Sequence, residues 1–186
     1  MERIMEDHLI YLIEQGQAWI RAQRELYRPQ GTELSPRMKR IFASYFSAAL
    51  LESVKVLQVP QIENPDFYVE LEQRGQTIPL NFTETQGITI YDTVLITQPE
   101  SEAGVFDSLY FHECVHVAQY RLLGIDAFIE QYVYGWAKNG CDYFTIPLER
   151  MAFEAEDLFQ KPPRQPFSVE ALVKAQLGAH LGRNRP

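Results

Sequence analysis

The pentapeptide His112-Glu113-Cys114-Val115-His116 constrains this chain more than any other feature of its sequence. It lies in a stretch with helical periodicity, and residues four apart in a helix leave the same face about one turn from each other. The two imidazoles can therefore bind one ion, and Glu113 can take a proton from a water molecule held there. This H-E-x-x-H motif predicts a helix that carries two zinc ligands and a general base.

Two histidines do not complete such a site, because zinc takes three protein ligands and keeps a fourth position open. His8 and His180 are the only other histidines, and both lie in predicted terminal helices. Carboxylates on the helix that follows the motif are better candidates for the third ligand: Glu149, Glu154, Glu156 and Asp157. We favour Glu149, because it lies in the first turn of its helix beside an irregular segment that can position it.

Three further residues lie on the same helix faces as the predicted metal ligands. Ala152 and Glu156 lie three and seven residues after Glu149 and share its helix face. A small alanine there lets the two helices approach closely, and Glu156 can accept a hydrogen bond from an imidazole N–H. Gln119 lies three residues after His116, so we expect it to contact a ligand or a substrate.

The remaining periodicities predict an α+β fold, a mostly helical single domain with a small antiparallel or mixed sheet before the active-site helix. We predict one domain over residues 1–186, with a helical part at 1–58, the sheet and zinc-site helices at 60–160, and a C-terminal helix and tail at 161–186. Helices are predicted at 4–27, 36–56, 106–123, 125–138, 148–160 and 168–181. Strands are predicted at 67–72, 78–82 and 87–97.

Composition excludes some partners and predicts a location. The net charge of −8 argues against nucleic acid as the main partner. No run of about 18 apolar residues occurs, so no membrane span is expected. The N-terminus lacks the basic and apolar segments of a signal peptide, and two cysteines fit a reducing compartment, so we expect a cytoplasmic protein. The oligomeric state stays open.

The motif followed by Glu-x-x-Ala on a later helix resembles the gluzincin group of zinc metallopeptidases. The resemblance covers roughly residues 87–160 and rests on five positions: His112, Glu113, His116, Glu149 and Ala152. It implies a zincin-like fold, bound Zn²⁺ with two histidine ligands and one glutamate ligand, and a peptide or protein substrate. Phe153 stands where many members of the group carry an acid.

The resemblance also implies a mechanism of peptide-bond hydrolysis. Glu113 would act as general base on a zinc-bound water and then protonate the leaving amine. A further donor must stabilise the oxyanion, and Tyr143 is our candidate, with Tyr134 and Tyr120 as rivals. The strand predicted at 87–97 resembles the sheet edge that pairs with an extended peptide in this group.

Two other functions remain open at this point. The chain can be a catalytically idle metal-binding or regulatory module, or a toxin-like or accessory domain whose partner recognises the substrate. The N-terminal helices can also cover the cleft as a built-in inhibitor.

Overall fold

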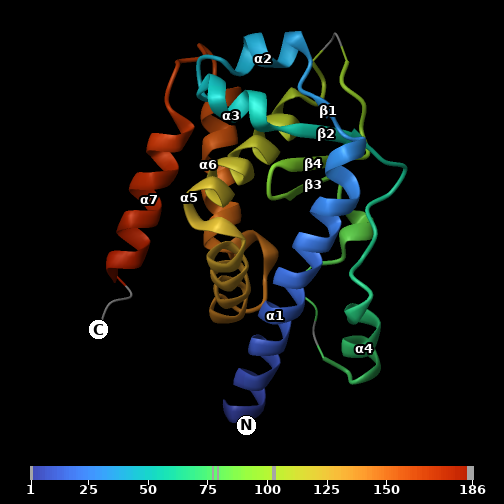
Figure 1. The fold of residues 1–186 in the computed structure, drawn as a ribbon. Helices are drawn as coiled ribbons and strands as arrows, with labels where there is room; N and C mark the ends of the chain where they lie inside the picture. Colours follow the sequence, from blue (N-terminus) through green and yellow to red (C-terminus); the bar gives the residue numbers. More distant parts are fainter. Residues whose placement is uncertain (1, 77, 79, 102–103, 184–186) are drawn as a thin grey trace.

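A long helix, α5 (Asp107–Lys138), organises the fold, because α1, α6, α7 and the sheet all contact it (Figure 1). The structure is a computed structural model that describes residues 2–76, 78, 80–101 and 104–183. The other helices in that part of the chain are α1 (Glu2–Tyr27), α2 (Pro36–Phe42), α3 (Ala48–Ser53), α4 (Phe67–Gln73), α6 (Pro147–Gln160) and α7 (Val169–Arg183). Single 3₁₀ turns occur at η1 (Arg28–Gln30), η2 (Phe82–Glu84) and η3 (Tyr143–Thr145).

The sheet is mixed, four-stranded and small. Its strands lie in the order β1 (Thr32–Glu33), β2 (Lys55–Gln58), β4 (Thr93–Ile96) and β3 (Gly87–Ile90). β2 and β4 run parallel, whereas β1 with β2 and β3 with β4 are antiparallel pairs. The predicted α+β class, mostly helical with a small sheet before the helix of the motif, is therefore confirmed. β3 is an edge strand, and it contacts both α5 and α1.

The helices around the motif begin and end close to where the sequence predicts. Gly124 interrupts α5 with a φ of 74° and a ψ of 171°, so the predicted helices at 106–123 and 125–138 are two halves of α5 that meet at a kink. Glycine suits this position because it adopts positive φ at low cost. Pro147 occupies the first turn of α6, where its fixed φ is favourable and its missing N–H costs nothing. The predicted basic tail at 184–186 lies outside the described residues.

The strand predicted at 67–72 is wrong, because these residues form α4. Tyr68 and Leu71 are the buried members of the segment, and their spacing of three fits one face of a helix. Val69, which the alternating pattern placed with the apolar face, is 57% exposed. Of the strand predicted at 78–82, residue 79 lies outside the described residues, residues 78, 80 and 81 belong to no helix or strand, and Phe82 begins η2.

The helix predicted at 36–56 is wrong in its middle and at its end. The hydroxyl of Ser47 accepts a hydrogen bond from the N–H of Leu50 and caps a new helix, α3. The carbonyl of Tyr45, in the connection between α2 and α3, accepts a hydrogen bond from the N–H of Val169 instead of one from a helical neighbour. The chain leaves α3 at Val54 and enters β2, where long-range pairing with β4 competes successfully with helix.

The single strand predicted at 87–97 is a hairpin, β3 and β4. The turn falls at Tyr91 and Asp92, and Tyr91 has a φ of 60°. Asp92 is held there by Arg24 of α1, through two hydrogen bonds of 2.9 Å, and by Arg28 at 3.1 Å. These ion pairs tie the hairpin to the end of α1.

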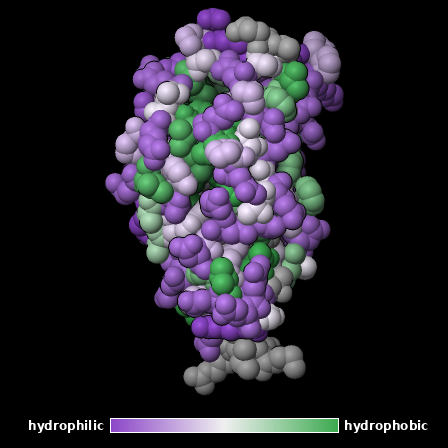
Figure 2. Space-filling view, turned by 90° about the vertical axis from the view of Figure 1, so that its right-hand side faces the viewer, coloured by the Kyte–Doolittle hydropathy of each residue, from purple (hydrophilic) through white to green (hydrophobic). Residues whose placement is uncertain are grey.

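The apolar core is one cluster that joins the helices to the sheet. The rings of Phe111 in α5 and Phe159 in α6 stack with centroids 4.3 Å apart, and Phe42 of α2 packs edge-on against both. Figure 2 shows one outer face, on which hydrophilic side chains cover most of the surface and hydrophobic atoms show between them. Within the described residues, no helix has the length and apolar character needed to cross a membrane.

Candidate metal centre

The first half of α5 points two buried imidazoles at one place. His112 and His116 are each 5% exposed, and their Nε2 atoms lie 3.1 Å apart. Residues 110–120 of this helix are all buried, so water is largely excluded from the motif. The helical spacing of four therefore has the consequence that the sequence predicts.

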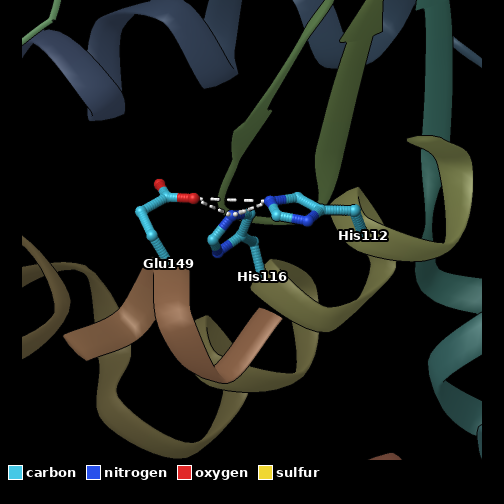
Figure 3. A group of neighbouring side chains, drawn as sticks. All are labelled: His112, His116 and Glu149. Carbon is cyan, nitrogen blue, oxygen red and sulfur yellow. Dashed lines mark hydrogen bonds and ion pairs between the residues drawn. The ribbon is translucent and has the colours of Figure 1, made fainter. Parts of the chain in front are cut away.

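Glu149 completes the group from the first turn of α6. Its Oε2 atom lies 3.3 Å from Nε2 of His112 and 3.3 Å from Nε2 of His116, and the residue is 4% exposed (Figure 3). Close packing of the two helices makes this possible, since a Cβ at Gly135 of α5 would come within 2.6 Å of the Pro147 ring that begins α6. Ala152, one turn after Glu149, is completely buried, as its proposed role requires.

The three donor atoms fit a small four-coordinate ion. Zinc binds histidine nitrogen and carboxylate oxygen at about 2.0–2.1 Å, which places tetrahedral ligands about 3.3–3.4 Å from one another. The three separations here are 3.1, 3.3 and 3.3 Å. Two imidazoles and one carboxylate with a vacant fourth direction are also the donor set of many catalytic zinc sites. The group His112, His116 and Glu149 can thus hold a metal ion without rearrangement.

The far nitrogen of each imidazole has a hydrogen-bond partner that fixes the ring. Nδ1 of His112 lies 3.1 Å from Oε2 of Glu156, and Nδ1 of His116 lies 2.8 Å from Oε1 of Gln119. The amide of Gln119 is oriented by its Nε2, which donates to the carbonyl of Leu148 at 2.8 Å. Both partners are acceptors, so each Nδ1 carries a proton and each Nε2 is the atom that would face a metal.

Two tyrosines hold the carboxylate of Glu149. Tyr143 donates to Oε2 at 2.7 Å, and Tyr132 donates to Oε1 at 2.9 Å. Burial and the neighbouring Glu149 raise the pKa of both tyrosines, so each hydroxyl keeps its proton. The sequence predicts Tyr143 at the site but does not predict the contact of Tyr132 with Glu149. The kink at Gly124 redirects the second half of α5, so helical spacing counted from His116 could not have placed Tyr132.

Glu113 lies against the edge strand β3. The hydroxyl of Thr89 lies 2.7 Å from Oε2 of Glu113 and donates to it. A Cβ at Gly87 would come within 2.6 Å of Oε1, so a larger residue there would displace this carboxylate from its present position. Thr89 and Gly87 were not predicted as site residues, and their one signal was their place in the strand before the motif.

Burial and mutual attraction set the charges of the group. Burial lowers the pKa of His112, but its hydrogen bonds with Glu149 and Glu156 outweigh this and raise the pKa to about 10. Burial raises the pKa of Glu149, but the two histidines outweigh it and hold the pKa below its usual range. Burial also raises the pKa of Glu113, against the opposing effect of His116. A dication bound at the two Nε2 atoms would displace any proton held there, so metal binding would release protons.

Of the remaining rival candidates, only Tyr120 lines the cavity at the metal group. Glu154 is exposed and accepts a hydrogen bond from Gln176 of α7, and Asp157 is exposed. The ring of Tyr134 lies under the ammonium of Lys138, and the residue does not line the cavity at the metal group. Tyr120 does line that cavity, but its ring stacks on Phe128 with centroids 3.6 Å apart. The structure therefore brings together His112, His116, Glu149, Glu113 and Tyr143.

Comparison of the chain with protein-family models, with curated proteins and with solved structures gives no match. The functional interpretation accordingly rests on the geometry of this group and on the cavity that it faces.

Proposed function

We propose that the chain is a zinc-dependent peptidase of the gluzincin type in which Glu113 acts as the general base. One observation carries this proposal. Three buried donor atoms from His112, His116 and Glu149 lie at the separations expected of a tetrahedral zinc site. The neighbouring carboxylate of Glu113 is not one of these three donors, so it can act as a base. A structural zinc site is usually closed by four protein ligands, whereas a catalytic site keeps one position open.

The identity of the ion follows from the donors. Imidazole nitrogens with a single carboxylate oxygen suit zinc better than calcium or magnesium, which prefer oxygen ligands. Bound between His112, His116 and Glu149, zinc would act as a Lewis acid that polarises a carbonyl group and acidifies water. Glu156 and Gln119 support this assignment, because hydrogen bonds to the far imidazole nitrogens orient the ligands and raise their basicity.

The chain's own residues would then move protons and hold charge. Glu113 would accept a proton from the attacking water and deliver it to the leaving amine. Thr89 would orient the carboxylate by its hydrogen bond to Oε2, and Gly87 would leave room beside it. Tyr143 would turn its hydroxyl proton from Oε2 of Glu149 to the developing oxyanion.

The decisive test separates metal binding from hydrolysis. The wild-type protein is expected to carry one zinc ion per chain by elemental analysis and to cleave casein or unstructured peptides. Glu113→Gln is expected to retain the zinc and to lose activity by about 10²- to 10⁴-fold, the usual contribution of a general base. Glu154→Gln, an exposed glutamate on α6, serves as the matched control and should leave both readouts unchanged.

Two outcomes would reject the proposal, the first its mechanism and the second its activity. One is equal cleavage by the wild-type and Glu113→Gln proteins, which would place catalysis elsewhere. The other is stoichiometric zinc in a wild-type protein that cleaves none of a diverse peptide library. That result would favour the alternative function, a catalytically idle metal-binding or regulatory module.

A further inference from the structure

The metal group opens into one end of a cavity of about 500 Å³. Besides the residues at the metal, its walls come from α1, α4, η2 and the second half of α5, segments that lie far apart in the sequence, and Phe128 adjoins His116 with ring centroids 6.1 Å apart. We call this part the apolar chamber and define it by six lining residues: Leu12, Trp19, Tyr68, Phe82, Phe128 and Ile129. These segments lie largely outside the stretch that resembles gluzincins, so the resemblance does not account for the chamber.

The charges of the cavity are confined to its metal end. Among the described residues that line it, the acids are Glu113, Glu149 and Glu156, and no lysine or arginine is present. The chamber offers no cation to pair with a substrate carboxylate, and no acid to pair with a substrate ammonium group. Because an unpaired charge is costly to bury, the chamber favours an uncharged apolar group.

Stacked aromatic rings form the walls. Trp19 of α1 stacks on Phe82 with centroids 5.4 Å apart and an interplanar angle of 17°, and Phe82 stacks in turn near Tyr68 at 6.1 Å. Phe128 stacks on Tyr120 at 3.6 Å. Flat aromatic faces of this kind bind aromatic and large aliphatic groups.

The wall that α1 provides is held in place. Gly16 packs so closely on Ile129 that an added Cβ would lie 3.1 Å from its Cγ2 atom. Arg21 pairs with Asp126 of α5, and Arg24 pairs with Asp92 of the hairpin at 2.9 Å. Three anchors on two elements argue that the chamber is formed before a ligand binds, which is typical of small-ligand pockets.

We propose that the apolar chamber receives a bulky uncharged side chain of a peptide substrate, next to the bond that is cleaved. The cleavage part of this inference rests on the proposed function, whereas binding by the chamber does not. The whole cavity, metal group included, has a volume of about 500 Å³, within the range of about 300–1,000 Å³ for small-ligand sites. Peptides with phenylalanine or leucine there are the expected substrates, and peptides with aspartate or lysine are disfavoured.

Binding can be tested without catalysis. The probes are N-acetylated amino-acid amides of phenylalanine, leucine, aspartate and lysine, added to zinc-loaded Glu113→Gln protein and followed by saturation-transfer NMR. We expect the apolar amides to bind about 10- to 200-fold more tightly than the charged ones, the discrimination typical of a hydrophobic pocket. Octanamide is the comparison probe for an acyl chain, and tighter binding of octanamide than of both apolar amides would overturn a peptide side chain as the occupant.

Two variants localise the binding. Trp19→Ala and Phe82→Ala remove different halves of one stacked pair, and each should weaken binding of the apolar amides about tenfold while leaving the charged amides unchanged. Leu26→Ala, an exposed position on the same helix as Trp19, is the control and should have no effect. Circular dichroism shows that each variant is folded before it is used.

The outcomes distinguish this inference from the proposed function. Selective binding of apolar amides by a protein that cleaves no peptide would support the chamber and reject the peptidase. Cleavage with equal kcat/KM for apolar and charged peptides would support the peptidase and overturn the chamber. Unchanged binding of the phenylalanine amide in both Trp19→Ala and Phe82→Ala would also overturn it.

Discussion

The metal centre and the apolar chamber line one cavity, and they are built in opposite ways. The metal centre takes its ligands from two consecutive helices and fixes them by hydrogen bonds of defined direction, such as that from His116 to Gln119. The chamber takes its walls from segments between Leu12 and Ile129 and holds them by packing of rings. The metal centre therefore depends on hydrogen bonds of fixed direction, whereas the chamber depends on apolar packing.

A substitution that removes a hydrogen bond or a metal ligand has a large effect, whereas one that removes part of an apolar wall has a smaller effect. Removal of one hydrogen-bond partner leaves a buried polar atom unsatisfied, and removal of a ligand leaves an incomplete coordination shell. Loss of one ring from a wall reduces apolar contact in proportion to the area lost. Substitutions at the metal end should therefore have larger effects than those in the chamber, and the following predictions test this order.

The largest effect is expected for loss of a ligand. His116→Ala should reduce zinc affinity by more than about 100-fold, beyond the loss typical of residues that only support a ligand. Elemental analysis after dialysis should find no stoichiometric zinc, and added zinc should no longer raise the melting temperature, because ligand binding to the folded state is the source of that stabilisation. His8→Ala, on α1, is the control and should keep its zinc. Stoichiometric zinc in His116→Ala would refute the site.

A methyl group at Gly87 should be the next most damaging change. In Gly87→Ala the Cβ would lie 2.6 Å from Oε1 of Glu113, so the carboxylate must move. We expect about a 100-fold loss of kcat with zinc content unchanged, since a misplacement of about 1 Å can cost that much. Gly178→Ala, where no atom lies within 4 Å of the added Cβ, is the matched control. Wild-type kcat in Gly87→Ala would show that Glu113 needs no such positioning.

Loss of the partner of an imidazole should be milder. Gln119→Met keeps the shape of the side chain but removes the acceptor for Nδ1 of His116. Zinc affinity, measured by competition with a chromophoric chelator, should fall about 10- to 100-fold. Gln131→Met lies on the same helix away from the cavity lining and should bind zinc as the wild type does. An unchanged affinity in Gln119→Met would mean that the hydrogen bond does not prepare the ligand.

The smallest effect on the metal is expected from the chamber. Trp19 stacks on Phe82 and not on a ligand, so Trp19→Ala should change zinc affinity by less than about twofold. The same chelator competition measures this, with the wild-type protein as reference. A change above about tenfold would show that the two ends of the cavity are coupled and would break the comparison.

Much of the metal centre could be predicted because helical geometry is local. The spacing of His112 and His116, and the place of Glu149 at the start of its helix, depend on a rise and a turn that every helix shares. The break at Gly124 and the helix start at Pro147 could also be predicted, because each residue restricts or frees its own backbone. Tyr132 was not, since the kink breaks the register by which it could be related to His116.

The errors in the fold have a common cause. In segment 67–72 the alternation of apolar residues fits a strand, but burial of Tyr68 and Leu71 against the rest of the chain selected a helix. In segment 36–56 the predicted helix forms as far as Phe42. The last residues of the segment instead form β2, which pairs with a strand almost 40 residues later. Short segments carry weak local preferences, and tertiary contacts override them.

The sequence by itself determined the α+β class, the helix of the H-E-x-x-H motif and the carboxylate that joins it, because these follow from periodicity and from the ends of helices. Only the tertiary structure decided that β3 supports Glu113 through Gly87 and Thr89, and that Trp19 of α1 lines the cavity. The physical reason is distance along the chain: contacts between remote segments depend on how helices pack, and packing leaves no period in the sequence.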